Sequence, residues 1–148
     1  MGIPTGEFLT LANGVRLHFH DEGAGSPVVL VHGAGMGASG WSNFKLNRSY
    51  LLEQGLRVIL PDLPGFGLSD KPTDVDYSTQ FFADTLVELI EALDLGPCTL
   101  VGNSMGGTVV LKTALDRPDL ASGLVLMGPG GLEDFETYMQ TEGNVLLR

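Results

Sequence analysis

The sequence predicts an α/β fold in which an antiparallel hairpin opens a mostly parallel sheet. Three observations lead to this prediction. Short apolar runs alternate with helical patterns along most of the chain, as they do in successive βαβ units. The pair Asn13-Gly14, a strong two-residue hairpin signal, separates two strand-like segments, 7–11 and 15–20. The motif Gly102-Asn-Ser-Met-Gly106 falls between a strand pattern and a helix pattern, which is the sequence context of a nucleophile elbow.

Between the hairpin and the elbow the sequence predicts two strands and two helices. Residues 28–31 and 57–60 are short apolar runs, as expected for strands that are covered on both faces. Residues 41–54 are expected to be mainly helical. The large apolar residues of 78–94 recur on one face, which predicts an amphipathic helix, and Ser78 stands where an N-cap is needed.

The elbow unit and one later strand complete the predicted sheet. The helix that begins at Met105 is expected to end near Asp116, because Pro118 disfavours its continuation. A further strand is expected after this helix. Functional loops of such sheets lie at the carboxyl ends of the strands. The predicted strands are 99–101 and 123–127, and the loops that should share one edge are 32–40, 61–70 and 102–106.

Composition narrows the class of protein. The chain has 148 residues, which suits one domain, and a net charge of −10, which disfavours nucleic acid or an anionic membrane as partner. It has no apolar run of transmembrane length and no signal-peptide pattern. The single cysteine, Cys98, excludes an internal disulfide and has no Cys or His neighbour for a metal site. We expect a cytoplasmic protein that acts on a small molecule without a metal or cofactor.

Ser104 is the candidate nucleophile. The tight turn of an elbow strains the serine backbone and lifts the hydroxyl above the sheet, while Gly102 and Gly106 let the strand and the helix approach closely. The helix N-terminus also favours developing negative charge. The alternative is a glycine-rich turn in which the serine merely caps the helix.

Backbone N–H groups near this serine could stabilise the oxyanion that forms when a carbonyl is attacked. One donor should be Met105, directly after the nucleophile, and the other should come from the glycine-rich loop after strand 28–31. We assign the second donor to Ala34, with Gly35 as the alternative. His32, at the start of this loop, is expected to shape the loop and not to act as the base.

The catalytic triad is incomplete in this sequence. In this type of fold the order along the chain is serine, then an acid, then a histidine. All three histidines precede the serine, and two of them share a face of the opening hairpin, where they are expected to be surface or packing residues. The aspartates after the serine lie at a helix end or in the terminal stretch. The residues concerned are His18, His20, His32, Asp116, Asp119 and Asp134.

Four stretches make this chain similar to the N-terminal half of an α/β-hydrolase, and more narrowly to the meta-cleavage product hydrolases. These enzymes hydrolyse a carbon–carbon bond in 2-hydroxy-6-oxo-2,4-dienoates. The narrower signals are Trp41-Ser-Asn43, Asn103 and the last of the four stretches. The stretches are His32-Gly-Ala-Gly-Met-Gly-Ala-Ser-Gly-Trp-Ser-Asn-Phe44, Pro61-Asp-Leu-Pro-Gly-Phe-Gly-Leu-Ser69, Gly102-Asn-Ser-Met-Gly-Gly107 and Met127-Gly-Pro-Gly-Gly131.

The resemblance implies that Asn43, Asn103 and Gly33 contact the polar end of a dienoate; the alternative for each asparagine is local hydrogen bonding in the loop or the elbow. Met36 departs from the family, which commonly has proline there. By the same resemblance, residues 1–131 are the N-terminal part of the hydrolase core and 132–148 begin the lid. The triad acid and histidine and a cationic substrate-binding arginine would then lie beyond Arg148, so we expect the chain alone to be inactive and the full-length protein to form a homo-oligomer.

Two other functions remain open from the sequence. One is an ordinary carboxylesterase, and the other is a noncatalytic ligand-binding relative, which the presence of both Ser104 and an oxyanion loop disfavours. Haloalkane dehalogenases and epoxide hydrolases are excluded, because they have aspartate at the nucleophile position.

Overall fold

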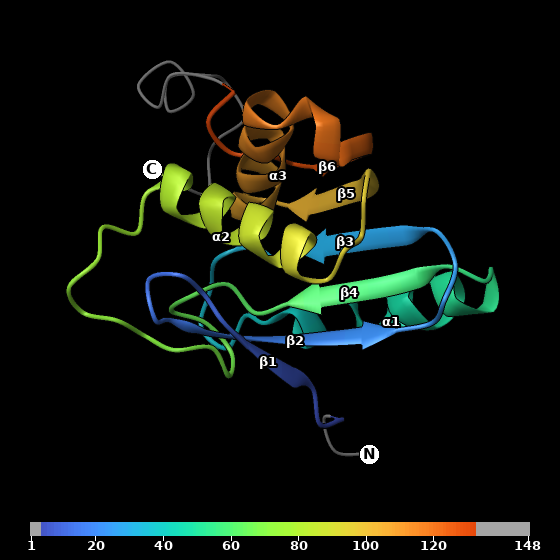
Figure 1. The fold of residues 1–148 in the computed structure, drawn as a ribbon, viewed down its shortest axis with the longest axis horizontal. Helices are drawn as coiled ribbons and strands as arrows, with labels where there is room; N and C mark the ends of the chain where they lie inside the picture. The colour runs from blue at the N-terminus through green and yellow to red at the C-terminus, as the bar shows by residue number, and fades with distance from the viewer. Residues whose placement is uncertain (1–3, 133–148) are drawn as a thin grey trace, which may run out of the picture.

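The computed structural model describes residues 4–132, which form a six-stranded sheet with helices on both faces (Figure 1). The strand order is β1-β2-β4-β3-β5-β6. β2 runs antiparallel to both β1 and β4, and the other pairs are parallel, as predicted. The elements are β1 Glu7–Thr10, β2 Arg16–Glu22, β3 Pro27–Val31, α1 Gly40–Glu53, β4 Arg57–Pro61, α2 Thr79–Ala92, β5 Cys98–Asn103, α3 Met105–Asp116, the 3₁₀ turn Pro118–Leu120 and β6 Ala121–Met127.

The opening hairpin has a three-residue loop, 12–14, between the two segments 7–11 and 15–20 that the sequence predicted as strands. The N–H of Leu11 donates to the carbonyl of Val15 at 2.9 Å, and the N–H of Gly14 donates to the carbonyl of Leu11 at 2.8 Å. Gly14 has a φ of 85°, which a residue with a side chain rarely adopts. A turn that ends in a left-handed glycine is the usual form of a three-residue hairpin loop.

Two hydrophobic cores lie on the two faces of the sheet. Figure 1 shows α2 and α3 on one face and α1 on the other. Because side chains alternate along a strand, Val29 and Val31 of β3 join the core beneath α2 and α3. Val28 and Leu30 point the other way and pack with Phe44 of α1. The continuous apolar run of β3 is therefore explained by burial on both faces, as the sequence predicted.

Two helix boundaries agree with the sequence. The Oγ of Ser78 accepts the Phe81 N–H at 3.2 Å and caps α2, and α3 ends at Asp116 just before Pro118. Within residues 4–132 no helix combines the length and the apolar character needed to cross a membrane. The predicted start of a lid at 132–148 falls, beyond Leu132, outside the described residues.

β6 forms an edge of the sheet in the described part of the chain, where it pairs only with β5. Leu124, Val125 and Met127 on this strand are 38%, 47% and 44% exposed. Val125 and Met127 line an apolar groove of about 630 Å³ on the face that carries α1. Within residues 4–132, β6 is therefore a partly exposed apolar edge of the sheet.

Candidate active site

The carboxyl ends of β3, β4 and β5 lead into the three loops that the sequence singled out. β3 and β5 are paired neighbours, with Val31 opposite Gly102, so the loop after β3 lies directly beside the elbow. A Cβ atom placed on Gly33 would be 3.2 Å from the Cβ of Ser104. A Cβ on Gly106 would overlap the carbonyl oxygens of Val31 and His32. The close approach of the strand–turn–helix unit to this loop therefore requires glycine.

Ser104 has the strained backbone expected of an elbow serine. Its φ of 53° and ψ of −118° correspond to the first central position of a type II′ turn, which glycine normally occupies. Its side chain makes no capping hydrogen bond to α3 and is exposed to solvent. The alternative of a serine that merely caps the helix is thereby wrong, although the structure does not test the role of nucleophile.

The predicted oxyanion donors lie where the fold leaves N–H groups available. Met105 is the first residue of α3, and the first N–H groups of a helix have no acceptor within the helix. Ala34 and Gly35 are exposed in the loop after β3, next to Gly33. Donation to an oxyanion by Met105, Ala34 or Gly35 stays a prediction.

His32 shapes its loop through both ring nitrogens. Its Nδ1 lies 2.8 Å from the carbonyl oxygen of Gly33, which can only accept, so Nδ1 carries the proton. Its Nε2 accepts the Leu63 N–H at 3.0 Å. The side chain is fully buried. With both nitrogens occupied, His32 fixes the loop after β3 against the loop after β4 and has no free lone pair for a base.

Burial makes the folded protein disfavour protonation of His32. Desolvation lowers the pKa of this imidazole, against smaller raising effects of the Gly33 carbonyl and the Asp62 carboxylate. The unfolded chain therefore binds a proton at His32 at a higher pH than the folded chain does. The stability that depends on neutral His32 is present above about pH 6.5 and is lost as the pH falls from there towards the lowered pKa.

We therefore expect the free energy of unfolding to fall by up to about 1.4 kcal/mol per pH unit below about pH 6.5 through His32 alone. Urea unfolding between about pH 7 and about pH 5 measures this slope. His32→Gln should be less stable throughout, with a flatter pH dependence. Because the two proteins differ only at this position, the difference between the two slopes isolates His32, and equal slopes would contradict the prediction.

The structure brings together the three residues that the resemblance assigned to substrate binding. The amide Nδ2 of Asn103 donates to Oδ1 of Asn43 at 2.8 Å. The N–H of Gly33 points at the same oxygen from 3.5 Å. The two asparagines come from β5 and α1, 60 residues apart in sequence. They therefore form a polar pair next to Ser104, but these bonds also satisfy the loop locally, so substrate contact stays a prediction.

Asp62 is a structural residue that sequence reasoning did not single out. It is 2% exposed, and its carboxylate accepts the N–H of Gly40 at 2.8 Å, the N–H of Leu68 at 3.0 Å and a hydrogen bond from His18 Nδ1 at 2.9 Å. One buried side chain thus ties the start of α1 and the 61–70 loop to β2. Its position directly after β4, in a Pro-Asp-Leu-Pro-Gly run, was the available signal.

None of the histidines supplies a base for the candidate nucleophile. His18 and His20 are buried packing residues, not surface residues, with exposed fractions of 2% and 3%. His18 is bonded to Asp62, and His20 Nε2 lies 3.0 Å from the carbonyl oxygen of Pro4. Within residues 4–132 no hydrogen bond joins a histidine to Ser104. The location of the triad acid and histidine stays a prediction.

Comparison with known proteins narrows the class. The chain is 40% identical over 133 residues to a 2-hydroxymuconate semialdehyde hydrolase of Pseudomonas sp. (strain CF600), a match that covers 90% of this chain and 45% of that protein. The structure matches a meta-cleavage product hydrolase from Pseudomonas fluorescens IP01, with a TM-score of 0.82 and 36% identity over 88% of this chain and 47% of the other. It also matches an esterase from Exiguobacterium antarcticum, with a TM-score of 0.80 and 33% identity over 90% and 49%.

The chain spans about half the length of these relatives. Residues 26–146 match the family described as the alpha/beta hydrolase fold. The mixed sheet, the strained serine between β5 and α3 and the glycine-rich loop beside it are consistent with that match. The chain therefore belongs to the α/β-hydrolase fold family.

Proposed function

We propose that the full-length protein is a serine hydrolase that cleaves a carbon–carbon bond in 2-hydroxy-6-oxo-2,4-dienoates. The observation that carries this proposal is the polar pair Asn43–Asn103 beside the strained, exposed Ser104. A simple ester gives such a pair nothing specific to bind, whereas a dienoate has a carboxylate and an enol oxygen at one end. The relatives named for such compounds, at about 40% identity, support the same choice.

The reaction uses Ser104 as a covalent nucleophile. The dienol first takes its ketone form as a proton moves from the 2-hydroxyl group to C5. The Ser104 hydroxyl then attacks the C6 carbonyl and gives its proton to a histidine in the remainder of the protein. The C5–C6 bond breaks, and its electron pair leaves with the dienol fragment, which is reprotonated. Water finally hydrolyses the acyl group from Ser104.

Two groups of backbone and side-chain donors assist these steps. The N–H groups of Met105 and Ala34, or of Gly35 in its place, stabilise the oxyanion at C6. The amides of Asn43 and Asn103 hold the polar head of the dienoate so that C6 lies over Ser104. The Asn103 amide already donates a hydrogen bond to Asn43, so both side chains are held in position before substrate binds.

The test compares kcat/KM for a dienoate and for p-nitrophenyl esters on the full-length protein. We expect the dienoate to be preferred. Asn103→Ala should lower kcat/KM for the dienoate by about 10- to 100-fold, because a hydrogen bond to a charged head group is lost, and should change ester hydrolysis little. Asn47→Ala is the matched control, since Asn47 lies on α1 but lines the apolar groove instead.

A carboxylesterase is the second candidate, favoured by the similarity to the Exiguobacterium antarcticum esterase. It predicts the opposite pattern in the same assay. A preference for esters, with Asn103→Ala harmless to both substrates, would assign the protein to this class. Asn43 and Asn103 would then be an ordinary structural contact between α1 and β5.

A further inference from the structure

The peptide group that joins Gly33 to Ala34 uses only one of its two polar groups within the described protein. Its carbonyl oxygen accepts a hydrogen bond from Nδ1 of His32 at 2.8 Å. Its N–H, which belongs to Ala34, donates to no backbone or side-chain acceptor among residues 4–132. Gly33 is buried, whereas Ala34 is exposed. This N–H therefore remains available to a ligand.

The bond to His32 fixes the direction of the Ala34 N–H. A trans peptide group is planar, and its C=O and N–H point in opposite directions. No peptide bond in the described part of the chain is cis. Because the Gly33 carbonyl points at the His32 ring, the Ala34 N–H must point away from that ring. The ring is fully buried, so the N–H is directed away from the interior.

His32 is itself held in one orientation and one tautomer. Its Nε2 accepts the Leu63 N–H at 3.0 Å, which requires the proton of the neutral ring to be on Nδ1, the nitrogen that donates to Gly33. The ring packs against Phe66, with 5.1 Å between the two ring centroids. The loop after β4 therefore fixes the ring, and the ring fixes the peptide group.

This peptide group lies close to the candidate nucleophile. A Cβ atom on Gly33 would be 3.2 Å from the Cβ of Ser104. The N–H of Gly33 points at Oδ1 of Asn43 from 3.5 Å, so Gly33 is held through its N–H as well as through its carbonyl. Rotation of the 33–34 peptide would break the bond to His32. The direction of the Ala34 N–H is thus set before a substrate binds, as oxyanion stabilisation requires.

We propose that His32 is a positioning residue of the oxyanion hole. Its Nδ1–H holds the Gly33 carbonyl inward, so that the Ala34 N–H points at the oxygen of a carbonyl group that Ser104 attacks. This inference rests on the proposed function for the attack by Ser104, and it selects Ala34 over Gly35 as the second donor. It does not depend on the choice between a dienoate and an ester, because both develop an oxyanion at the attacked carbon.

Two substitutions in the full-length protein separate the two ring nitrogens. Asparagine places its amide near Nδ1 and can still donate to Gly33, whereas glutamine places its amide near Nε2 and can only replace the bond to Leu63. His32→Gln should lower kcat by about 10- to 100-fold, part of the cost of losing an oxyanion donor, with KM little changed. His32→Asn should keep kcat within about threefold of the wild type. The assay uses the dienoate and p-nitrophenyl acetate.

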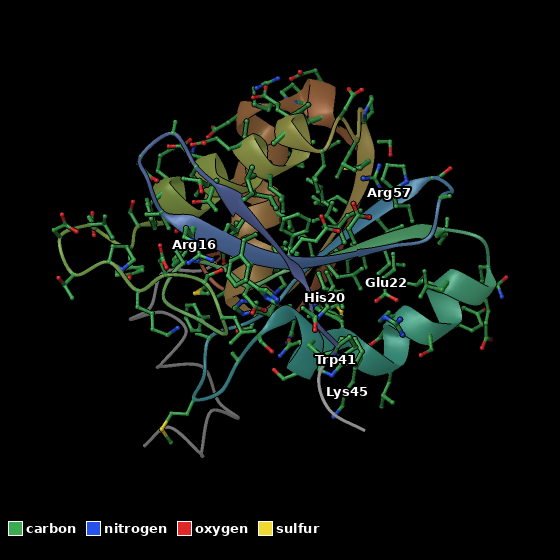
Figure 2. The ribbon with its side chains drawn as sticks, turned by 60° about the horizontal axis from the view of Figure 1, so that its bottom comes forward. Arg16, His20, Glu22, Trp41, Lys45 and Arg57 are labelled. Atoms are coloured by element: carbon green, nitrogen blue, oxygen red, sulfur yellow. The ribbon has the colours of Figure 1, made fainter. Side chains whose placement is uncertain are left out.

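His20 supplies the matched control. It is also a buried histidine beside a backbone carbonyl, with 3.0 Å between Nε2 and the Pro4 oxygen, but among the described residues it bonds to none in the loop after β3. Figure 2 shows it near Trp41, where β2 meets the start of α1. His20→Asn, which loses the Nε2 bond, should lower stability and leave kcat within about threefold of the wild type.

A measurement on the unmodified protein covers the case in which His32→Gln does not fold. Imidazole nitrogen chemical shifts should show the proton of His32 on Nδ1, and the other tautomer would overturn the proposal. Equal losses of kcat in His32→Gln and His32→Asn, or a raised KM with kcat unchanged, would overturn it as well. Activity that survives Ser104→Ala would remove the proposed function and this inference with it, whereas a preference for esters removes only the dienoate.

Discussion

Ser104→Ala in the full-length protein should lower kcat by about 10⁴- to 10⁶-fold, because the covalent step loses its nucleophile. KM for the dienoate should change much less, since Asn43 and Asn103 are untouched. Steady-state kinetics with the dienoate measure both values. A protein that keeps more than about a hundredth of its activity would not use Ser104 as nucleophile, because oxyanion binding and positioning alone leave far less.

The backbone of Ser104 makes substitutions there informative about stability as well. At a φ of 53° any side chain is strained, so Ser104→Gly should be more stable than the wild type by about 0.4–1 kcal/mol or unchanged. Ser78→Ala is the matched control, because it removes the α2 cap and should lower stability by about 1 kcal/mol with kcat unchanged. Loss of activity without loss of stability at Ser104, and the reverse at Ser78, separates a functional serine from a structural one.

Gly106→Ala should destabilise the protein by about 3 kcal/mol, at the upper end for overpacking. The added Cβ would overlap backbone carbonyls of Val31 and His32, and neither strand β3 nor its loop can retreat without disturbing the sheet. Activity should fall as well, because the same shift would move the elbow away from Gly33. Chemical denaturation and the dienoate assay on one preparation measure both effects.

Gly123→Ala is the control for Gly106. Gly123 has no left-handed backbone, and its added Cβ would meet nothing closer than Thr99 Oγ1 at 3.4 Å. Stability should therefore change by less than about 0.5 kcal/mol. Similar effects at both positions would show that the packing of the elbow against the loop after β3 is looser than the structure indicates.

Those elements that local chemistry specifies were well predicted from the sequence. Ser78 needs only the three residues after it to cap α2, and Pro118 alone limits α3. The elbow was predictable because Gly102, Ser104 and Gly106 have their roles within a single turn. The sequence assigned Asn43 and Asn103 a shared role near the nucleophile but did not predict that they contact each other. No local rule places the start of α1 beside the end of β5.

Long-range pairing was the part that local patterns could not supply. β4 lies between β2 and β3 in the sheet, although it follows β3 in sequence. This order depends on pairing between strands that are far apart in the chain, which local patterns do not specify. The burial of His18 depends on Asp62, 44 residues away, which supplies the partner that makes a buried imidazole tolerable.

The order of strands in the sheet also bears on the order in which the strands can pair during folding. The β1–β2 hairpin joins neighbours in sequence and can form within microseconds. The central strand β3 must wait for partners made later, first β4 and then, beyond α2, β5. Because distant pairings slow folding, a chain emerging from the ribosome would hold β3 with one open side until β5 arrives. We expect the turn that carries Ser104 to form only after β5 has paired with β3.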